Sequence, residues 1–159
     1  MTLVIRPGEK ADVSVIAHLI HELARFEKLE HEVTMTEKLV AENLFGQHSY
    51  AETLIAEDGG NPIGFALFFH TFSTFLGKPG LYLEDLFVVP EQRSRGVGRA
   101  LLRDLARIAL ERGCGRLEWA VLNWNSEAIK FYQRLGARPN FDWTVYRLAG
   151  EALTALGRE

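Results

Sequence analysis

The spacing of apolar residues along the chain predicts strands and helices in alternation. Apolar runs rich in β-branched and aromatic residues predict strands, which fall at 3–6, 51–57, 63–72, 81–89, 116–122 and 141–148. Apolar residues at helical spacing predict helices, which fall at 11–26, 36–44, 98–112 and 126–135, with a helical turn or two within 150–158. Thr36 is the predicted cap of the second helix, Asn125 is among the N-cap candidates of the fourth, and Gly136 follows the fourth at its C-cap. A strand, a helix and a strand in succession predict a right-handed parallel crossover. We therefore expect an α/β fold in which helices flank a mixed central sheet.

The turn after the second strand adds two local expectations. Asp58-Gly59-Gly60-Asn61-Pro62 is a strong turn signal, so the strands on either side should form an antiparallel hairpin. Gly64 lies inside the following strand, where a glycine marks a bulge or a close approach of another backbone.

Composition places the chain among ordinary globular proteins. Its 159 residues fit one domain, 1–159, and 47% of them are hydrophobic. A net charge of −3 argues against nucleic acid or an anionic membrane as partner. Cys114 is the only cysteine, which excludes an intrachain disulfide and fits a reducing compartment. With no secretion signal and no apolar run of about 18 residues, we expect a cytoplasmic protein.

The stretch 81–98 combines an apolar strand with unusual chemistry. Glu84 and Asp85 lie within the strand, where carboxylates are costly unless they are paired, hydrated or used. The motif Arg93-x-x-Gly96-x-Gly98 follows and opens a helix, whose free N–H groups and dipole favour an anion such as phosphate. It lacks the Lys-Ser/Thr of a Walker loop and the third glycine of a dinucleotide fingerprint. The alternative interpretation is a tight turn with solvated arginines.

Histidines on the first helix are a weaker candidate. His18 and His21 have the i, i+3 spacing that can hold a metal, but no further ligand pattern accompanies them. We interpret them as histidines at the edge of the helix and expect no metal.

Four features in order resemble the GNAT superfamily of N-acetyltransferases. They are Glu84-Asp85 in its strand, the loop 93–98, Asn125 opening a helix, and Phe131-Tyr132-x-x-x-Gly136-Ala137 closing it. The chain is most similar to the diamine (spermidine/spermine) and thialysine branch. The resemblance implies a sheet splayed between its fourth and fifth strands and acetyl-CoA as co-substrate. It also implies a small primary amine as acceptor, and a homodimer in which 141–148 supplies an interlocked strand.

The resemblance implies roles for individual residues. The amine must lose a proton with a pKa of about 10, and the leaving thiolate must gain one near about 8.5, so a base and an acid are needed. Tyr132 matches the family's acid, with a core aromatic as the alternative. Glu84 matches a carboxylate that holds the amine and relays its proton. Asp85, on the opposite face of the strand, is interpreted as structural or as a substrate contact.

Two sets of contacts follow from the same resemblance. The cofactor would pair with the backbone of 87–89 and rest its pyrophosphate on the amides of 95–99, while an N–H near Phe87 polarises the acetyl carbonyl. The expected acetyl-CoA contacts are Phe87, Val88, Val89, Arg93, Arg95, Gly96, Val97, Gly98, Arg99, Asn125, Ser126, Ala128 and Tyr132. The expected amine contacts are Phe26, Glu27, Glu84, Asp85 and Glu118, of which Glu27 and Glu118 could equally be plain surface residues.

Three departures from the branch bear on the substrate. Phe26 stands where polyamine enzymes tend to have tyrosine, Ser94 stands where they have glycine, and Asp142-Trp143 replaces a longer acidic loop. These departures put long polyamines in doubt more than acetyl transfer itself. The alternatives are acetylation of a protein or an aminoglycoside, and a non-catalytic CoA-binding regulatory module.

Overall fold

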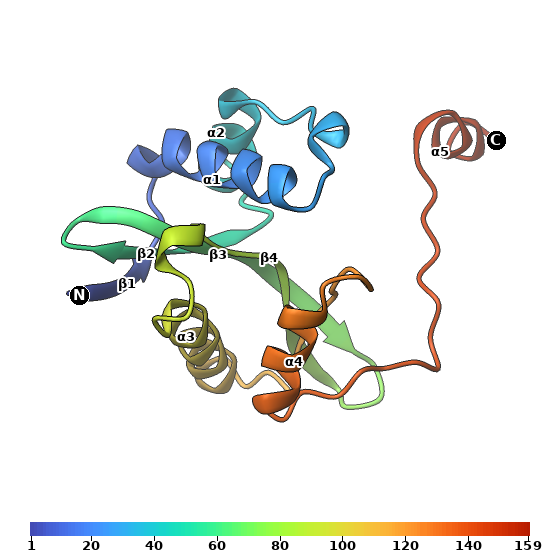
Figure 1. Cartoon of the computed structure of the whole chain (residues 1–159). Helices are drawn as coiled ribbons and strands as arrows, with labels where there is room; N and C mark the ends of the chain where they lie inside the picture. Colours follow the sequence, from blue (N-terminus) through green and yellow to red (C-terminus); the bar gives the residue numbers. More distant parts are fainter. The chain divides into compact units, whose positions relative to one another are not determined.

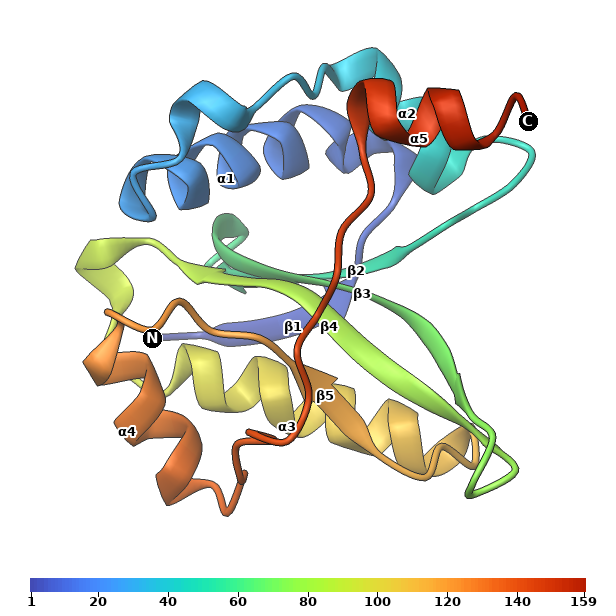
Figure 2. The ribbon, with the colours of Figure 1, turned by 90° about the vertical axis from the view of Figure 1, so that its right-hand side faces the viewer.

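The computed structural model describes all residues, 1–159, and they divide into two compact units, Met1–Ala120 and Val121–Glu159. The first unit contains a five-stranded sheet whose order follows the chain. Every neighbouring pair is antiparallel except β4 and β5, which are parallel. Strands β1 to β4 are labelled in Figure 1, and β5 is labelled in Figure 2. The strands are β1 (Leu3–Pro7), β2 (Glu52–Asp58), β3 (Asn61–Ser73), β4 (Lys78–Val88) and β5 (Leu117–Trp119). The predicted mixed sheet is confirmed.

Helices cover both faces of this sheet. Helices α1 (Val13–Phe26) and α2 (Glu37–Phe45) lie on one face, and α3 (Val97–Glu111) lies on the other (Figure 2). The predicted cap of α2 is confirmed, since the Thr36 hydroxyl accepts a hydrogen bond from the Leu39 amide at 3.2 Å. No helix of the structure is both long and apolar enough to cross a membrane.

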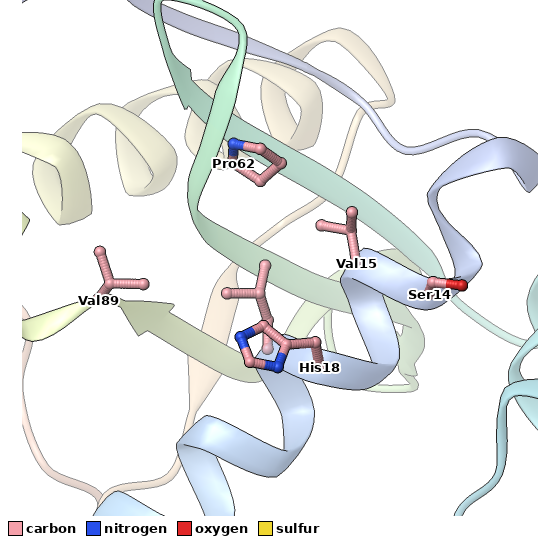
Figure 3. A pocket seen from close by; sticks show the side chains of 6 residues that line it. Ser14, Val15, His18, Pro62 and Val89 are labelled. Atoms are coloured by element: carbon pink, nitrogen blue, oxygen red, sulfur yellow. The ribbon is translucent and has the colours of Figure 1, made fainter.

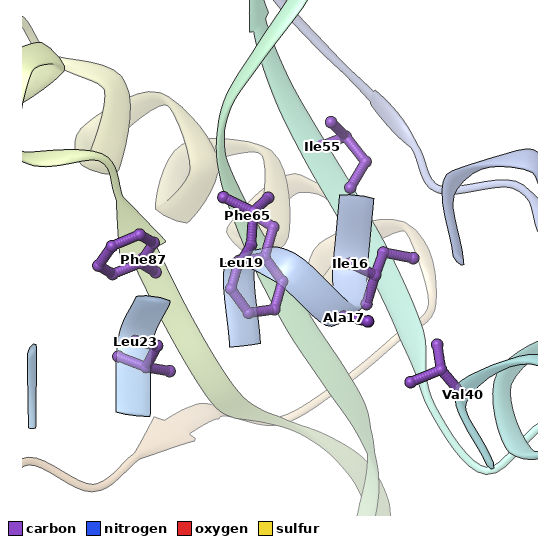
Figure 4. Close-up of a cluster of buried hydrophobic side chains, with 8 residues drawn as sticks. All are labelled: Ile16, Ala17, Leu19, Leu23, Val40, Ile55, Phe65 and Phe87. Atoms are coloured by element: carbon purple, nitrogen blue, oxygen red, sulfur yellow. The ribbon is translucent and has the colours of Figure 1, made fainter. Parts of the chain in front are cut away.

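The core on the α1 face joins that helix to the middle strands. Figure 4 shows the side chains of Leu19 and Leu23 beside Phe65 on β3 and Phe87 on β4. Phe65 is fully buried and Phe87 nearly so. Burying an aromatic side chain of this size contributes about 1.5–3 kcal/mol. The cluster therefore fixes the end of β4 against α1, which is the region that contains the predicted site.

Gly64 confirms the expectation of a close approach. A Cβ at this position would lie 2.7 Å from the backbone oxygen of Phe87, a distance that side chains do not adopt. The pairing of β2 with β3 also shifts register beside it, between Ala56 and Glu57. Only glycine lets β3 approach β4 this closely, so Gly64 helps to set the path of β4.

The second unit contains α4 (Ser126–Arg134) and α5 (Gly150–Leu156). The predicted cap of α4 is confirmed, because Asn125 Oδ1 accepts a hydrogen bond from the Ala128 amide at 3.2 Å. Gly136 follows the helix with a φ of 86°, a left-handed conformation that glycine adopts without strain.

One strand prediction was too long, and another was wrong. The strand predicted over 116–122 is limited to β5, which pairs with β4 for three residues only. The strand predicted over 141–148 is irregular chain. In that segment Phe141, Trp143, Val145 and Tyr146 are between 75% and 93% exposed. Its alternating sequence favours a strand, but a strand also needs a neighbour to satisfy its backbone groups, and here the chain supplies none.

Candidate active site

A β-bulge in β4 organises the predicted amine site. On β3, Phe68 lies opposite Leu83 and the preceding residue, Leu67, lies opposite Asp85, so Glu84 is an extra residue in β4. A bulge of this kind shifts the alternation of side chains by one position. Odd-numbered residues before the bulge, such as Leu83, therefore point to one face of the sheet, and odd-numbered residues after it, such as Phe87, point to the other.

The two faces can be followed from the burial pattern. Leu83, before the bulge, lies on the α3 face together with its partner Phe68. The guanidinium carbon of Arg112, which follows the last residue of α3, lies 6.0 Å from the centroid of the Phe68 ring. Phe87, after the bulge, packs into the core cluster under α1 (Figure 4). Asp85 is two residues before Phe87 and shares its face. The bulge thus turns Asp85 toward α1 and leaves Glu84 exposed.

Asp85 has an unusual electrostatic environment. Burial, followed by the nearby charges of Glu84 and Glu27, raises the pKa of Asp85 to about 7 from an ordinary value of 3.8. Glu27 follows the last residue of α1, and burial raises its pKa as well. Three carboxylates therefore lie close enough to repel one another, an arrangement that a cation would relieve.

Tyr82 extends this acidic region along β4. It lies opposite Phe69, with the two ring centroids 5.3 Å apart. Burial first, and then the charges of Glu84 and Glu118, raise the pKa of the Tyr82 phenol. Glu118 itself lies 2.7 Å from Arg116, so its charge is partly compensated. Sequence reasoning did not single out Tyr82, although its place two residues before Glu84 in the same strand was the available signal.

Arg93 connects the end of β4 with the end of α1. Its Nε donates a hydrogen bond to the Val88 carbonyl at 2.9 Å. Its guanidinium carbon lies 4.3 Å from the centroid of the Phe26 ring and 5.5 Å from that of Phe87. Such cation–π contacts are worth about 0.5–2 kcal/mol each. Arg93 therefore links the end of β4 to the end of α1.

The loop between β4 and α3 contains the residues that are predicted to bind an anion. Ser94 and Gly96 both have positive φ, at 61° and 84°. Gly96 is the N-cap residue of α3. The Gly96 carbonyl accepts the first helical hydrogen bond, from the Ala100 amide. The amides of 97–99 precede that bond, so they are free of helical partners. Arg95 and Arg99 are exposed beside them, and Arg95 also donates to Gln92.

The ladder between β4 and β5 ends early. It joins Leu81 to Leu117 and finishes at Leu83 opposite Trp119, whereas β4 continues to Val88. Beyond Leu83 the edge of β4 is not paired by β5. This is the separation of the fourth and fifth strands that the sequence predicted, and it leaves backbone groups beside the bulge for another partner.

The remaining predicted residues lie in the second unit. Asn125 caps α4, Ser126 is its first residue, and Ala128 donates to the cap. Tyr132 lies in the last turn of the helix, with its ring centroid 5.5 Å from that of Phe131. The role of Tyr132 as an acid stays a prediction.

A shallow pocket of about 340 Å³ lies beside the end of β4. Figure 3 shows Val15 and His18 of α1 facing Pro62 at the start of β3 and Val89 at the end of β4. Its lining is mostly apolar, and His18 is the one titratable residue among the six. None of the predicted amine contacts lines it.

Comparison with known proteins identifies relatives over nearly the whole chain. Residues 16–137 match the model of the acetyltransferase (GNAT) family. The chain is 34% identical over 163 residues to a thialysine N-epsilon-acetyltransferase of Mus musculus, covering 96% of this chain and 95% of the relative. It is 31% identical over 199 residues to an L-ornithine N5-acetyltransferase of Arabidopsis thaliana, covering 97% and 87%. An integron cassette protein of V. cholerae, known as a solved structure, aligns with a TM-score of 0.84 and 28% identity, over 100% of this chain and 99% of that one.

Proposed function

The chain belongs to the acetyltransferase (GNAT) family, and we propose that it transfers the acetyl group of acetyl-CoA to a primary amine of a small cationic molecule. The observation behind this proposal is the group of carboxylates around the bulge of β4, formed by Glu84, Asp85 and Glu27. A diamine, or an amino acid with an amine at the end of its side chain, presents the positive charge that such a group favours. Thialysine and ornithine, named for two relatives, are molecules of this class.

The residues present also fit acetyl-CoA. Its pyrophosphate would rest on the amides of 97–99 at the start of α3, where positive charge from Arg95 and Arg99 adds to the helix dipole. A Cβ added to Gly96 would meet no atom within 4 Å, so the space beside this glycine is open to the pyrophosphate. Its extended arm would pair with the edge of β4 beyond Leu83, which β5 leaves uncovered.

The chemistry requires two proton transfers. The amine nitrogen attacks the acetyl carbon, a C–N bond forms and the C–S bond breaks, so two protons leave the nitrogen. The first goes to a base before the attack, and the second is balanced by the proton that the thiolate receives. In this proposal Glu84 holds the ammonium group and Tyr132 donates the proton to the sulfur. Both roles rest on the resemblance of these positions to the family's motifs.

A substrate panel tests the proposal. Free thiol released from acetyl-CoA is measured with thialysine, ornithine, a short diamine, spermidine and an aminoglycoside. We expect turnover with the short amines, and a loss of about 10²–10⁴-fold in kcat when Tyr132→Phe removes the acid. Glu84→Gln should raise the KM of the amine more than that of acetyl-CoA, because it removes an ammonium contact.

Binding of acetyl-CoA without turnover of any primary amine would contradict the proposal and favour a regulatory CoA-binding module. Turnover with the aminoglycoside alone would also contradict the substrate class. Tyr132→Phe with unchanged kcat would remove the phenol from the mechanism.

We also propose that two copies of the chain associate through 141–148. This segment exposes five large apolar side chains, including Leu148, and lacks a strand partner within the chain. A second copy could supply that partner by β-strand addition. Light scattering measures the mass: a dimer is expected for the wild type, and Trp143→Lys with Val145→Lys should yield a monomer. A wild type that is monomeric at all concentrations would contradict this proposal.

A further inference from the structure

Asp85, which is half-buried, differs from Asp12, the buried aspartate of the first unit, and the difference indicates a function. Asp12 is 8% exposed and shares the guanidinium of Arg6 with Glu57, at 2.7 Å and 2.6 Å. Hydrogen bonds from Arg6 lower the pKa of Asp12. This is how a structural carboxylate is normally accommodated. The charged groups that act on Asp85, in contrast, are carboxylates.

We propose that Asp85, rather than Glu84, accepts the proton that the substrate ammonium loses before it attacks the thioester. This inference rests on the proposed acetyl transfer and gives the role of base to Asp85, whereas the resemblance implied Glu84 as the proton relay. The bulge at Glu84 turns Asp85 onto the face shared with Phe87 and α1, whereas Glu84 remains exposed to solvent. An exposed carboxylate can attract a cation. A partly buried carboxylate accepts a proton more readily, because burial disfavours its charged form.

Charged and titratable groups from several elements lie on or beside the face of the sheet that Asp85 shares with Phe87. Glu84 adjoins Asp85 on β4, and Glu27 approaches from the end of α1. Tyr82 lies on the same face of β4, and Arg93 stacks on the neighbouring Phe87. The two carboxylates disfavour a negative charge on Asp85 as long as no cation is bound.

The magnitude of this effect favours Asp85 over an ordinary carboxylate. Transfer of a proton from an ammonium group with a pKa of about 10 to an ordinary carboxylate is unfavourable by about 10⁶-fold. With the pKa of Asp85 at about 7, the same transfer is unfavourable by about 10³-fold. A base close to the working pH still has an appreciable ionised fraction, which is the compromise that general bases require.

The proposed step is balanced without another reactant. The ammonium N–H bond breaks and the proton passes to a carboxylate oxygen of Asp85. The free amine then attacks the acetyl carbon, the C–N bond forms and the C–S bond breaks. The nitrogen loses its second proton as the amide forms, and this loss balances the proton that the thiolate receives through Tyr132. After the product leaves, Asp85 returns its proton to water.

The pH dependence of kcat/KM distinguishes Asp85 from Glu84. For the wild type, kcat/KM should rise with pH up to about 7 and then level off before the amine titrates at about 10. In Asp85→Asn the break near 7 should vanish, and kcat/KM should keep rising toward the pKa of the amine, with a loss of about 10²–10⁴-fold at neutral pH. Glu84→Gln should keep the break but move it to lower pH, because a neighbouring negative charge is gone.

Two additional measurements keep the outcomes separate. Asp85→Glu should restore the break, and binding of CoA to Asp85→Asn should match the wild type if the fold is intact. A break near 7 that persists in Asp85→Asn, or that disappears in Glu84→Gln, would overturn the assignment while acetyl transfer stands. Absence of turnover in the wild type would overturn the proposed function and this inference together.

Discussion

The stability of the protein should fall as the pH rises toward neutrality, and Asp85→Asn should remove the part of that loss that comes from Asp85. In the folded chain the pKa of Asp85 is about 7, against an ordinary value of 3.8. A carboxyl with a raised folded-state pKa stabilises the fold fully below its ordinary pKa, and this contribution is lost as the pH rises through the folded-state pKa. The loss therefore falls between about pH 4 and about pH 7.

The size of the effect follows from the same shift. Each pH unit within the window corresponds to about 1.4 kcal/mol for one proton. Between about pH 5 and about pH 8, the full shift would lower the free energy of unfolding by about 2.6 kcal/mol. Asp85 is partly exposed, and solvent screens the repulsion from its neighbours, so we expect a loss of about 1–2.5 kcal/mol.

Urea unfolding at about pH 5 and about pH 8 measures this difference. Asparagine has the shape of a protonated carboxyl and cannot ionise, so Asp85→Asn should gain stability relative to the wild type as the pH rises. The exposed neighbour offers a matched control, since Glu84→Gln should keep most of the pH dependence. If the wild type and Asp85→Asn lose the same free energy between the two pH values, the reasoning is refuted.

Three further substitutions test other parts of the first unit. Asp12→Asn should lower the free energy of unfolding by about 1–3 kcal/mol at neutral pH by weakening its pairing with Arg6. Because Arg6 lowers the pKa of Asp12 from 3.8, that difference should vanish in thermal unfolding as the pH falls through the folded-state pKa, and a constant difference would contradict the pairing. Gly64→Ala should destabilise by about 1–3 kcal/mol in urea, since its Cβ would lie 2.7 Å from the Phe87 oxygen; a neutral effect would show that the strands relax. Arg93→Met should destabilise by about 1–2 kcal/mol, whereas unchanged stability with a raised KM for acetyl-CoA would indicate a phosphate contact instead.

The sequence predicted best those features that depend on local chemistry. Thr36 and Asn125 were identified as cap residues because a short polar side chain before an apolar-periodic run satisfies the free amides of a helix start. The positive φ of Gly136 follows a similar local rule. The resemblance to the acetyltransferase family was also confirmed, because its motifs are carried by such local positions.

Features that depend on distant partners were less predictable. The sequence of 141–148 alternates as a strand should, but pairing needs a second strand that no pattern within the segment specifies. The bulge at Glu84 is likewise defined by the register of β3 against β4, so sequence could not tell which carboxylate faces α1. The stacking of Arg93 on Phe26 joins residues far apart in the chain, and no local signal reveals it.

Several expectations about the site and its setting stay predictions. They include the contacts of the residues expected to bind acetyl-CoA and the amine, a cytoplasmic location, the homodimer and the description of the chain as one domain. Each depends on a bound molecule, a second copy or the cell, none of which a pattern along one chain specifies.

The bulge in β4 has a consequence for how chains of this kind can change. Glu84 is the residue without a partner on β3, so its deletion would leave Asp85 opposite Leu67 and Phe87 opposite Phe65. Loss of a single codon would thus remove one negative charge while every later side chain kept its orientation. This strand therefore provides a point at which affinity for cations can drift between relatives without any rearrangement of the hydrophobic interior.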